Sequence, residues 1–196
     1  MIGIVDYGAG NLGSVANALQ ALGQPHRCCT NAAELESVTR VVLPGVGHFG
    51  AAARALLDSG LFAALQDWAR RGQPLFGICL GMQLLFASSE EAPGAPGLGL
   101  LPGRCERLRS RRVPHLGWNQ LQWRGTAPAG DEAPFVYFAH SFHVVGAEPG
   151  DIEAVASLEA TEVLAACRRG GIGGCQFHPE KSGPTGLRLL QQWLSC

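Results

Sequence analysis

The stretch PLFGICLGMQLLF, residues 74–86, constrains this chain more than any other part of it. An apolar run leads directly into GICLG, and a helix-forming run follows at once. G-x-C-x-G has the pattern of a strand-to-helix nucleophile elbow, with sulfur in place of the serine oxygen. Because so sharp a turn crowds its neighbours, small residues are needed on both sides of its apex. The stretch therefore predicts an α/β fold with Cys79 at the tip of a tight turn.

The predicted elbow has chemical consequences for Cys79. A helix N-terminus favours a thiolate over a thiol, because its dipole and its free N–H groups attract negative charge. The backbone N–H of Leu80 would point to where an oxyanion forms during attack on a carbonyl group. The alternative is a buried cysteine between two packing glycines, which the motif alone does not exclude. Cys79 is therefore a candidate nucleophile.

Apolar runs alternate with helical patterns through the first half of the chain. The runs are bounded by glycine or proline, and several are rich in valine and isoleucine. Such runs between helices are typical of a parallel sheet that is covered on both faces. The pattern predicts strands at residues 2–7, 26–29, 40–45 and 74–78, and helices at residues 11–22, 49–57, 61–71 and 80–89.

The pattern changes after a glycine- and proline-rich stretch that ends near residue 103. Strand-like runs then follow one another with little helix between them. We expect strands at residues 105–110, 119–123, 134–140, 152–157, 163–168 and 171–177, and a closing helix at residues 184–194. Because no repeat or long linker separates the halves, we expect a single domain over residues 1–196, with the second half extending the sheet.

The composition excludes several classes of protein. Of the 196 residues, 46% are hydrophobic and 16% are charged, and the net charge of −1 offers no overall attraction to nucleic acid or anionic membranes. The seven cysteines are an odd number in a chain too long to depend on disulfides. The first residues lack a signal-peptide pattern, and no apolar run approaches the roughly 20 residues of a membrane helix. We expect a cytoplasmic protein with mostly free thiols.

The first predicted strand is followed by G-x-G-x-x-G at Gly8, Gly10 and Gly13. This spacing is the dinucleotide-binding fingerprint, which also needs an acidic residue about 20 positions later, at the end of the second strand. Residues 26–31 read HRCCTN, and Glu34 comes too late, on the next predicted helix. We interpret these glycines as a packing turn and not as an NAD or FAD site.

A thiol nucleophile needs a base, and the base needs a group that orients it. His178 follows the last predicted strand in the sequence HPE, and Glu180 comes two residues later. Residues i and i+2 of an extended chain project from one face, so Glu180 could hold the tautomer of His178. The other histidines fit less well; His115, for example, lies in the turn-like PHLG. Cys175 and His178 form C-x-x-H without a second ligand pair, so no zinc site is expected.

The third predicted strand ends in a glycine-rich loop, Gly45-Val46-Gly47. Such a loop can aim backbone N–H groups at an oxyanion or a ligand carboxylate, although taken alone it is also an ordinary turn. Ligands of open α/β sheets bind at the carboxyl ends of the parallel strands. The loop, Cys79 and the His178–Glu180 pair are therefore expected at one edge of the sheet.

GICLGMQLL together with HPE resembles the class I, or triad, glutamine amidotransferases. The resemblance implies a three-layer, flavodoxin-like fold whose mostly parallel central sheet is extended by antiparallel strands. In that family Cys79 would attack the glutamine carboxamide, His178 would transfer the proton, and Glu180 would orient His178. Water would then hydrolyse the glutamyl thioester to glutamate. No metal or cofactor is implied.

Five further blocks narrow the resemblance to one branch of the family. DYGAGNLGS, LPGVGHFG, PHLGWN, YFAHSFHV and HPEKSG, within residues 6–183, are similar to the branch that passes ammonia to a (β/α)8 cyclase subunit in histidine biosynthesis. The branch implies a heterodimer whose partner-facing residues include Asn11, Trp118, Tyr137 and Lys181. It implies an oxyanion and glutamine pocket formed by Gly45, Val46, Gly47, Leu80, Gln83, His140, Ser141 and Phe142.

Three other interpretations are open at this point. The first is another triad glutaminase, serving anthranilate, aminodeoxychorismate or pyridoxal phosphate synthesis; PGVG and the lysine after HPE speak against it. The second is a cysteine hydrolase or chaperone acting alone, which leaves HPE unexplained. The third is an RNA-binding module, although no aromatic residues interleave with its arginines for stacking. That module would use Arg104, Arg107, Arg109, Arg111 and Arg112.

Overall fold

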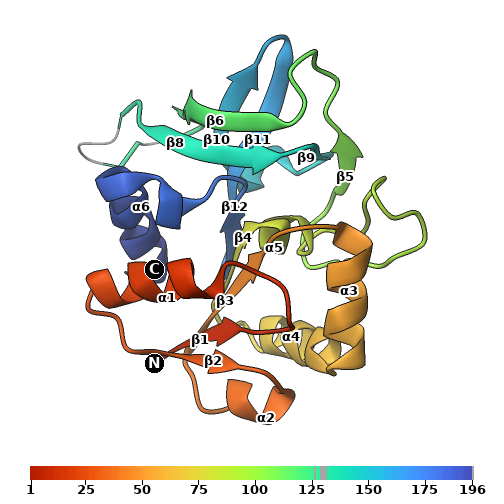
Figure 1. Cartoon of the computed structure of the whole chain (residues 1–196), viewed down its shortest axis with the longest axis vertical. Helices are drawn as coiled ribbons and strands as arrows, with labels where there is room; N and C mark the ends of the chain where they lie inside the picture. The colour runs from red at the N-terminus through yellow and green to blue at the C-terminus, as the bar shows by residue number, and fades with distance from the viewer. Residues whose placement is uncertain (126, 129–131, 196) are drawn as a thin grey trace.

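The computed structural model describes residues 1–125, 127–128 and 132–195. Within these residues eight strands form one central sheet, in the order β2-β1-β3-β4-β12-β11-β10-β7 (Figure 1). The parallel part contains β1 (Ile2–Val5), β2 (His26–Cys29), β3 (Arg40–Gly45), β4 (Leu75–Cys79) and β12 (Ile172–Cys175). Its strand order is that of flavodoxin-like folds. The antiparallel extension contains β11 (Thr161–Arg169), β10 (Ile152–Leu158) and β7 (Gln122–Trp123). The predicted fold class is confirmed.

Helices cover both faces of the sheet and make three layers (Figure 1). One face carries α1 (Leu12–Ala21) and α6 (Gly183–Ser195), whose buried Leu19 and Leu190 pack in one core. The other face carries α2 (Ala32–Leu35), α3 (Phe49–Asp58) and α4 (Leu61–Arg70), whose buried Leu35, Leu56 and Leu65 belong to a second core. Within the described part of the chain, no helix is long and apolar enough to cross a membrane.

Two short antiparallel ribbons stand beside the sheet (Figure 1). One pairs β5 (Arg104–Arg107) with β9 (Phe142–Val145), and the other pairs β6 (His115–Gln120) with β8 (Phe135–His140). β9 was not predicted from the sequence, because only Ser141 separates it from β8 and the apolar pattern runs through both. The expectation that His115 lies in a turn was wrong, since it begins β6 and pairs with His140.

The helix predicted at residues 80–89 is wrong in length. α5 spans only Leu80–Gln83. Beyond it, the carbonyl groups of Leu84 and Leu85 accept hydrogen bonds from the N–H groups of Leu98 and Leu100, at 2.7 and 2.8 Å. The glycine- and proline-rich segment after Ser89 therefore takes the carbonyl groups that a longer helix would use. Helical periodicity in the sequence does not reveal this competition, because the partners come from a distant segment.

Candidate active site

Cys79 lies at the junction of β4 and α5, at the carboxyl edge of the parallel strands. Its backbone has φ 55° and ψ −112°, a conformation that residues with a side chain rarely adopt. The residue is nearly buried, and the next residue, Leu80, begins the helix. The predicted strand-to-helix elbow is present, with the cysteine at its apex.

The two glycines of the elbow are required by close contacts with backbone. A Cβ atom on Gly77 would lie 2.6 Å from the carbonyl carbon and oxygen of Gly81. A Cβ atom on Gly81 would lie 1.8 Å from the carbonyl oxygen of Leu43 on β3. Because these neighbours are main-chain atoms, they cannot move aside as a flexible side chain can. The G-x-C-x-G pattern thus follows from sterics around Cys79.

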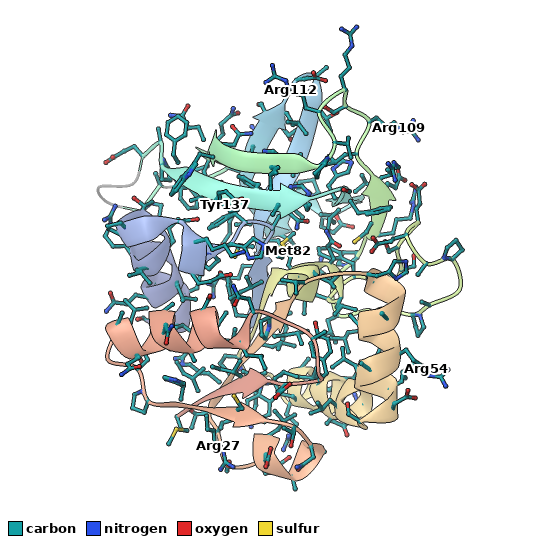
Figure 2. The ribbon with its side chains drawn as sticks, viewed as in Figure 1. Arg27, Arg54, Met82, Arg109, Arg112 and Tyr137 are labelled. Atoms are coloured by element: carbon teal, nitrogen blue, oxygen red, sulfur yellow. The ribbon has the colours of Figure 1, made fainter. Side chains whose placement is uncertain are left out.

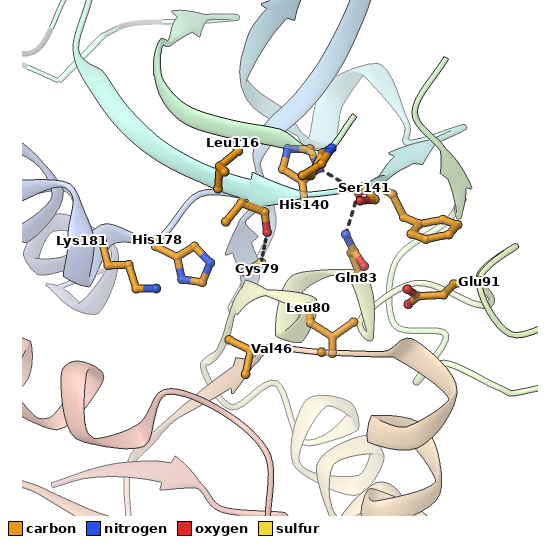
Figure 3. A pocket seen from close by; sticks show the side chains of 14 residues that line it. Val46, Cys79, Leu80, Gln83, Glu91, Leu116, His140, Ser141, His178 and Lys181 are labelled. Atoms are coloured by element: carbon orange, nitrogen blue, oxygen red, sulfur yellow. Dashed lines mark hydrogen bonds between the residues drawn. The ribbon is translucent and has the colours of Figure 1, made fainter. Parts of the chain in front are cut away.

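His178 lies beside Cys79, although 99 positions later in the sequence, and it contacts Glu180 as well (Figure 3). The Nδ1 atom of His178 donates to Oε1 of Glu180 at 2.8 Å, and the two side chains are 4% and 1% exposed. The expected geometry was wrong in one respect: residues Pro179–Lys181 form a 3-10 turn and not an extended strand. The turn folds the carboxylate back onto the ring, so the predicted pair still forms.

The imidazole of His178 interacts with both Cys79 and Glu180. Burial lowers the pKa of His178, but hydrogen bonds to Cys79 and Glu180 and the negative charges of those groups outweigh burial. Together they raise the pKa from 6.5 to about 9. Since Nδ1 is used by Glu180, the other ring nitrogen faces the sulfur. The arrangement places an imidazole with a raised pKa against the sulfur, where it can hold a proton at neutral pH and deliver it to a leaving group.

A cavity of about 330 Å³ opens above Cys79 and His178 (Figure 3). Seven of the eight residues predicted for the oxyanion and glutamine pocket line it: Val46, Gly47, Leu80, Gln83, His140, Ser141 and Phe142. The eighth, Gly45, is buried in β3 opposite Cys79, where a Cβ atom would lie 2.6 Å from the backbone nitrogen of Gly81. Gly45 therefore packs against the elbow and does not line the cavity.

Amide side chains connect the cavity wall to the sulfur. The Nε2 atom of Gln83 donates to the carbonyl oxygen of Phe142 at 2.8 Å and to Oε1 of Gln176 at 2.9 Å. The Nε2 atom of Gln176 donates to Sγ of Cys79 at 3.7 Å. Gln176 is completely buried and was not predicted from the sequence. A polar residue in the otherwise apolar end of the last strand, just before His178, was the available signal.

Of the four predicted partner-facing residues, Lys181 lines the cavity, while the others lie on the β6–β8 ribbon and just before α1. Trp118 on β6 and Tyr137 on β8 are paired across the ribbon, with ring centroids 6.1 Å apart, and Trp118 is 57% exposed. Asn11 precedes α1, and α1 packs against the 3-10 turn that contains Lys181. Lys181 also lines the cavity with His178, which the sequence analysis did not predict (Figure 3). The partner-facing role of these residues stays a prediction.

The packing role predicted for the G-x-G-x-x-G stretch was wrong for Gly8 and Gly13, because a Cβ atom added to either would meet no described atom within 4 Å. Gly8 and Gly10 have φ of +83° and +134°, which glycine adopts without strain. Glu34 lies on α2 and accepts a hydrogen bond from the backbone N–H of Thr30 at 2.6 Å. The expectation that no carboxylate reaches the end of β2 was therefore wrong, but this carboxylate is already occupied there by the N–H and hydroxyl groups of Thr30, the residue after the strand.

The arginines of the RNA-binding alternative lie on and after β5, and the guanidinium of Arg107 lies 5.9 Å from the ring centroid of Phe142, which lines the cavity. Arg109 and Arg112 project from the end of the molecule that carries the ribbons (Figure 2). Glu106 pairs with Arg104 and lies 4.0 Å from Arg109. An acidic side chain thus interrupts the basic surface, as expected for a solvated face with mixed charge.

Comparisons with known proteins agree with this geometry. The family model described as glutamine amidotransferase class-I matches residues 3–195. A relative from Synechococcus sp. (strain CC9605), named imidazole glycerol phosphate synthase subunit HisH, is 44% identical and covers 99% of this chain and 93% of its own. A relative of the same name from Geobacillus kaustophilus (strain HTA426) is 45% identical, with 99% and 96% covered.

Solved structures resemble this chain over nearly its whole length. A crystal structure described as a glutamine amidotransferase has a TM-score of 0.81 at 22% identity, with 99% of this chain and 97% of that chain covered. The structure of PurLQS from Thermotoga maritima has a TM-score of 0.77 at 20% identity, with the same coverage. At these identities the likeness concerns the fold.

Proposed function

This chain belongs to the class I glutamine amidotransferase family, and from that premise we propose that it is the glutaminase subunit of imidazole glycerol phosphate synthase. It hydrolyses glutamine to glutamate and ammonia. It passes the ammonia to a cyclase subunit, which makes imidazole glycerol phosphate and AICAR in histidine biosynthesis. The observation that carries the chemistry is the buried contact of His178 with both Cys79 and Glu180.

In the proposed mechanism the Cys79 sulfur attacks the carboxamide carbon of glutamine. The backbone N–H groups of Leu80 and of Val46 and Gly47, in the loop after β3, stabilise the oxyanion. The carbon–nitrogen bond then breaks while His178 delivers its proton to the departing ammonia, and a glutamyl thioester remains. Water attacks the thioester with His178 as the base, which releases glutamate and restores the thiolate. The raised pKa of His178 supports its role as proton donor.

Glutamine would occupy the cavity above Cys79. About 330 Å³ suits one small polar metabolite, and the lining combines a few polar side chains with apolar ones. Among these, Gln83, His140, Ser141 and Phe142 form the wall on the side of β8 and β9. The fit supports one glutamine molecule with its carboxamide toward the sulfur.

The proposed partner is a (β/α)8 cyclase subunit that docks over the cavity mouth to form a heterodimer. The outward face of the β6–β8 ribbon supports this, because Leu116, Trp118 and Phe135 are each more than half exposed. Apolar side chains gathered on one surface are typical of a protein contact. Asn11, Tyr137 and Lys181 would complete the interface, and ammonia would leave the cavity toward the barrel.

Two further inferences complete the proposal. We assign residues 1–196 to one domain, since strands from both halves of the sequence share the central sheet. We also assign the chain to the cytoplasm, where histidine biosynthesis would supply its partner. The alternative triad glutaminases would instead pair with another synthase, such as one that uses chorismate.

The test uses the complex of this chain with its cyclase partner. Cys79→Ala should abolish glutamine-dependent synthesis of imidazole glycerol phosphate, while synthesis from added ammonia continues. Full glutamine-dependent activity in this variant would reject the assignment. Co-purification from the source cell, followed by mass spectrometry, should identify a cyclase barrel, and a chorismate-using partner would reassign the function.

A second test concerns coupling between the subunits. The isolated chain should hydrolyse glutamine weakly, and the rate should rise strongly with the partner and its ligand, since uncoupled hydrolysis wastes glutamine. Equal turnover with and without the barrel would contradict the coupling.

A further inference from the structure

His115 and His140 form a buried pair that the proposed mechanism does not use. They face each other across β6 and β8, and are 4% and 6% exposed. The Nδ1 atom of His115 lies 2.9 Å from the Nε2 atom of His140. At one end of this pair, Asn119 Nδ2 lies 3.0 Å from His115 Nε2. At the other end, His140 Nδ1 lies 2.9 Å from the carbonyl oxygen of Phe142.

The hydrogen positions in this series of hydrogen bonds are determined by the groups at its two ends, the Phe142 carbonyl oxygen and the Asn119 amide. A carbonyl oxygen only accepts, so His140 carries its hydrogen on Nδ1 and accepts on Nε2. His115 must therefore donate from Nδ1. Asn119 Nδ2 also donates to the carbonyl oxygen of Ser157 at 2.9 Å, which orients its amide. His115 consequently accepts from Asn119 on Nε2, and both imidazoles are neutral with the hydrogen on Nδ1.

An additional proton on either ring would leave two donors facing each other somewhere in the chain. If His140 carried a second hydrogen on Nε2, His115 would have to accept on Nδ1 and carry its own hydrogen on Nε2. That hydrogen would then face the Nδ2 donor of Asn119. The environment also disfavours the charge, because burial lowers the pKa of His115 to about 4 and that of His140 to about 3. The pair is thus held in one protonation state and one tautomer.

The series of hydrogen bonds through His115 and His140 ends on the wall of the glutamine pocket. The carbonyl oxygen of Phe142 accepts from His140 and from Gln83 Nε2, at 2.9 and 2.8 Å. Gln83 in turn donates to Gln176, whose amide donates to the Cys79 sulfur. One sequence of hydrogen bonds therefore connects His115, which does not line the cavity, with the nucleophile.

We propose that His115 is a positioning residue for the glutaminase reaction: through His140 it holds the Phe142 carbonyl and, with it, the Gln83 side of the pocket. The proposal rests on the proposed function for the identity of the reaction. Its geometric part, two neutral imidazoles of the Nδ1–H tautomer, does not depend on that function. The two parts can therefore be tested separately.

The first experiment reads the tautomers directly. Long-range ¹H–¹⁵N spectra of the full chain, with ¹⁵N-labelled histidine, distinguish Nδ1–H, Nε2–H and charged imidazoles. We expect the ring signal lost in His115→Asn and the one lost in His140→Asn to be those of neutral Nδ1–H imidazoles. Both should persist in the control His26→Asn on β2, which loses only the signal of its own ring, whose Nδ1 donates to the carbonyl oxygen of Gln24. An Nε2–H or charged ring at His115 or His140 in the wild type would overturn the proposal.

The second experiment measures glutaminase kinetics in the complex with the cyclase subunit. His115→Leu should lower kcat/KM for glutamine about tenfold, as expected for an unmade buried hydrogen bond, and mainly through KM. His115→Asn keeps a donor near the position of Nδ1 and should stay within about threefold of wild type. His26→Leu should match the wild type.

The outcomes separate the two proposals. A wild-type complex without glutaminase activity overturns the proposed function. In an active complex, a His115→Leu variant within about twofold of wild type overturns the positioning role. A His115→Asn variant as impaired as a folded His115→Leu variant overturns it as well. If His115→Leu does not fold, the wild-type spectra and the His115→Asn kinetics still decide.

Discussion

The backbone conformation at Cys79 predicts that the nucleophile is held at a cost in stability. Its φ of 55° and ψ of −112° suit glycine but strain any residue with a Cβ atom. Both Cys79→Ala and Cys79→Gly remove the sulfur and its contacts. Only the glycine variant also removes the Cβ atom, so the comparison of these two variants isolates the strain.

The magnitude follows from two opposing terms. A non-glycine residue in a sparsely populated conformation costs about 1–3 kcal/mol. Replacing a buried alanine by glycine in ordinary backbone costs about 1 kcal/mol, because the unfolded glycine is more flexible and a buried methyl group is lost. At position 79 the two terms oppose each other. Cys79→Gly should therefore be at least as stable as Cys79→Ala, and by up to about 2 kcal/mol more stable.

The assay is equilibrium unfolding in urea, followed by far-UV circular dichroism, with the free energy of unfolding obtained by linear extrapolation. Ala165→Gly in β11 is the matched control, because Ala165 is completely buried in the same sheet. This control should lose about 1 kcal/mol. If glycine at position 79 lowers stability relative to alanine as much as the Ala165 control does, the elbow is not strained and the reasoning fails.

Three further predictions concern the elbow and the base. Gly81→Ala should lower the free energy of unfolding by about 3 kcal/mol or more in urea titrations, because its Cβ atom would lie 1.8 Å from the carbonyl oxygen of Leu43. The control Gly13→Ala should not destabilise the chain, because no described atom lies within 4 Å of the added Cβ. Glu180→Gln should lower the pKa of His178 below about 9, since the carboxylate raises it, and an unchanged midpoint in an NMR titration would contradict this. The raised pKa also predicts that His178 stabilises the fold fully below pH 6.5 and loses this contribution as the pH rises to about 9. The free energy of unfolding should therefore fall over that interval relative to His178→Asn. Parallel curves for the two proteins would refute the prediction.

The fold could be predicted from local patterns wherever apolar spacing and flanking breakers alone mark an element. The strand at residues 40–45 has the bounds expected from its apolar spacing and flanking residues, and the helix expected at residues 49–57 begins at Phe49 and ends one residue later, at Asp58. The prediction failed where distant segments compete for the same groups. α5 ends at Gln83 because the loop after Ser89 binds the next carbonyl groups. β9 was missed because a change of pairing partner at Ser141 leaves no mark in hydrophobic periodicity.

The sequence by itself determined the elbow around Cys79 and the identity of His178 and Glu180 as its partners, because steric demand and spacing act within a few residues. Only the tertiary structure decided which groups surround the sulfur. Gln176 donates to Cys79 across 97 positions, and His115 adopts its tautomer because His140 and Asn119 meet it from either side. A hydrogen bond depends on distance and direction in space, and a linear pattern contains neither for residues that folding brings together.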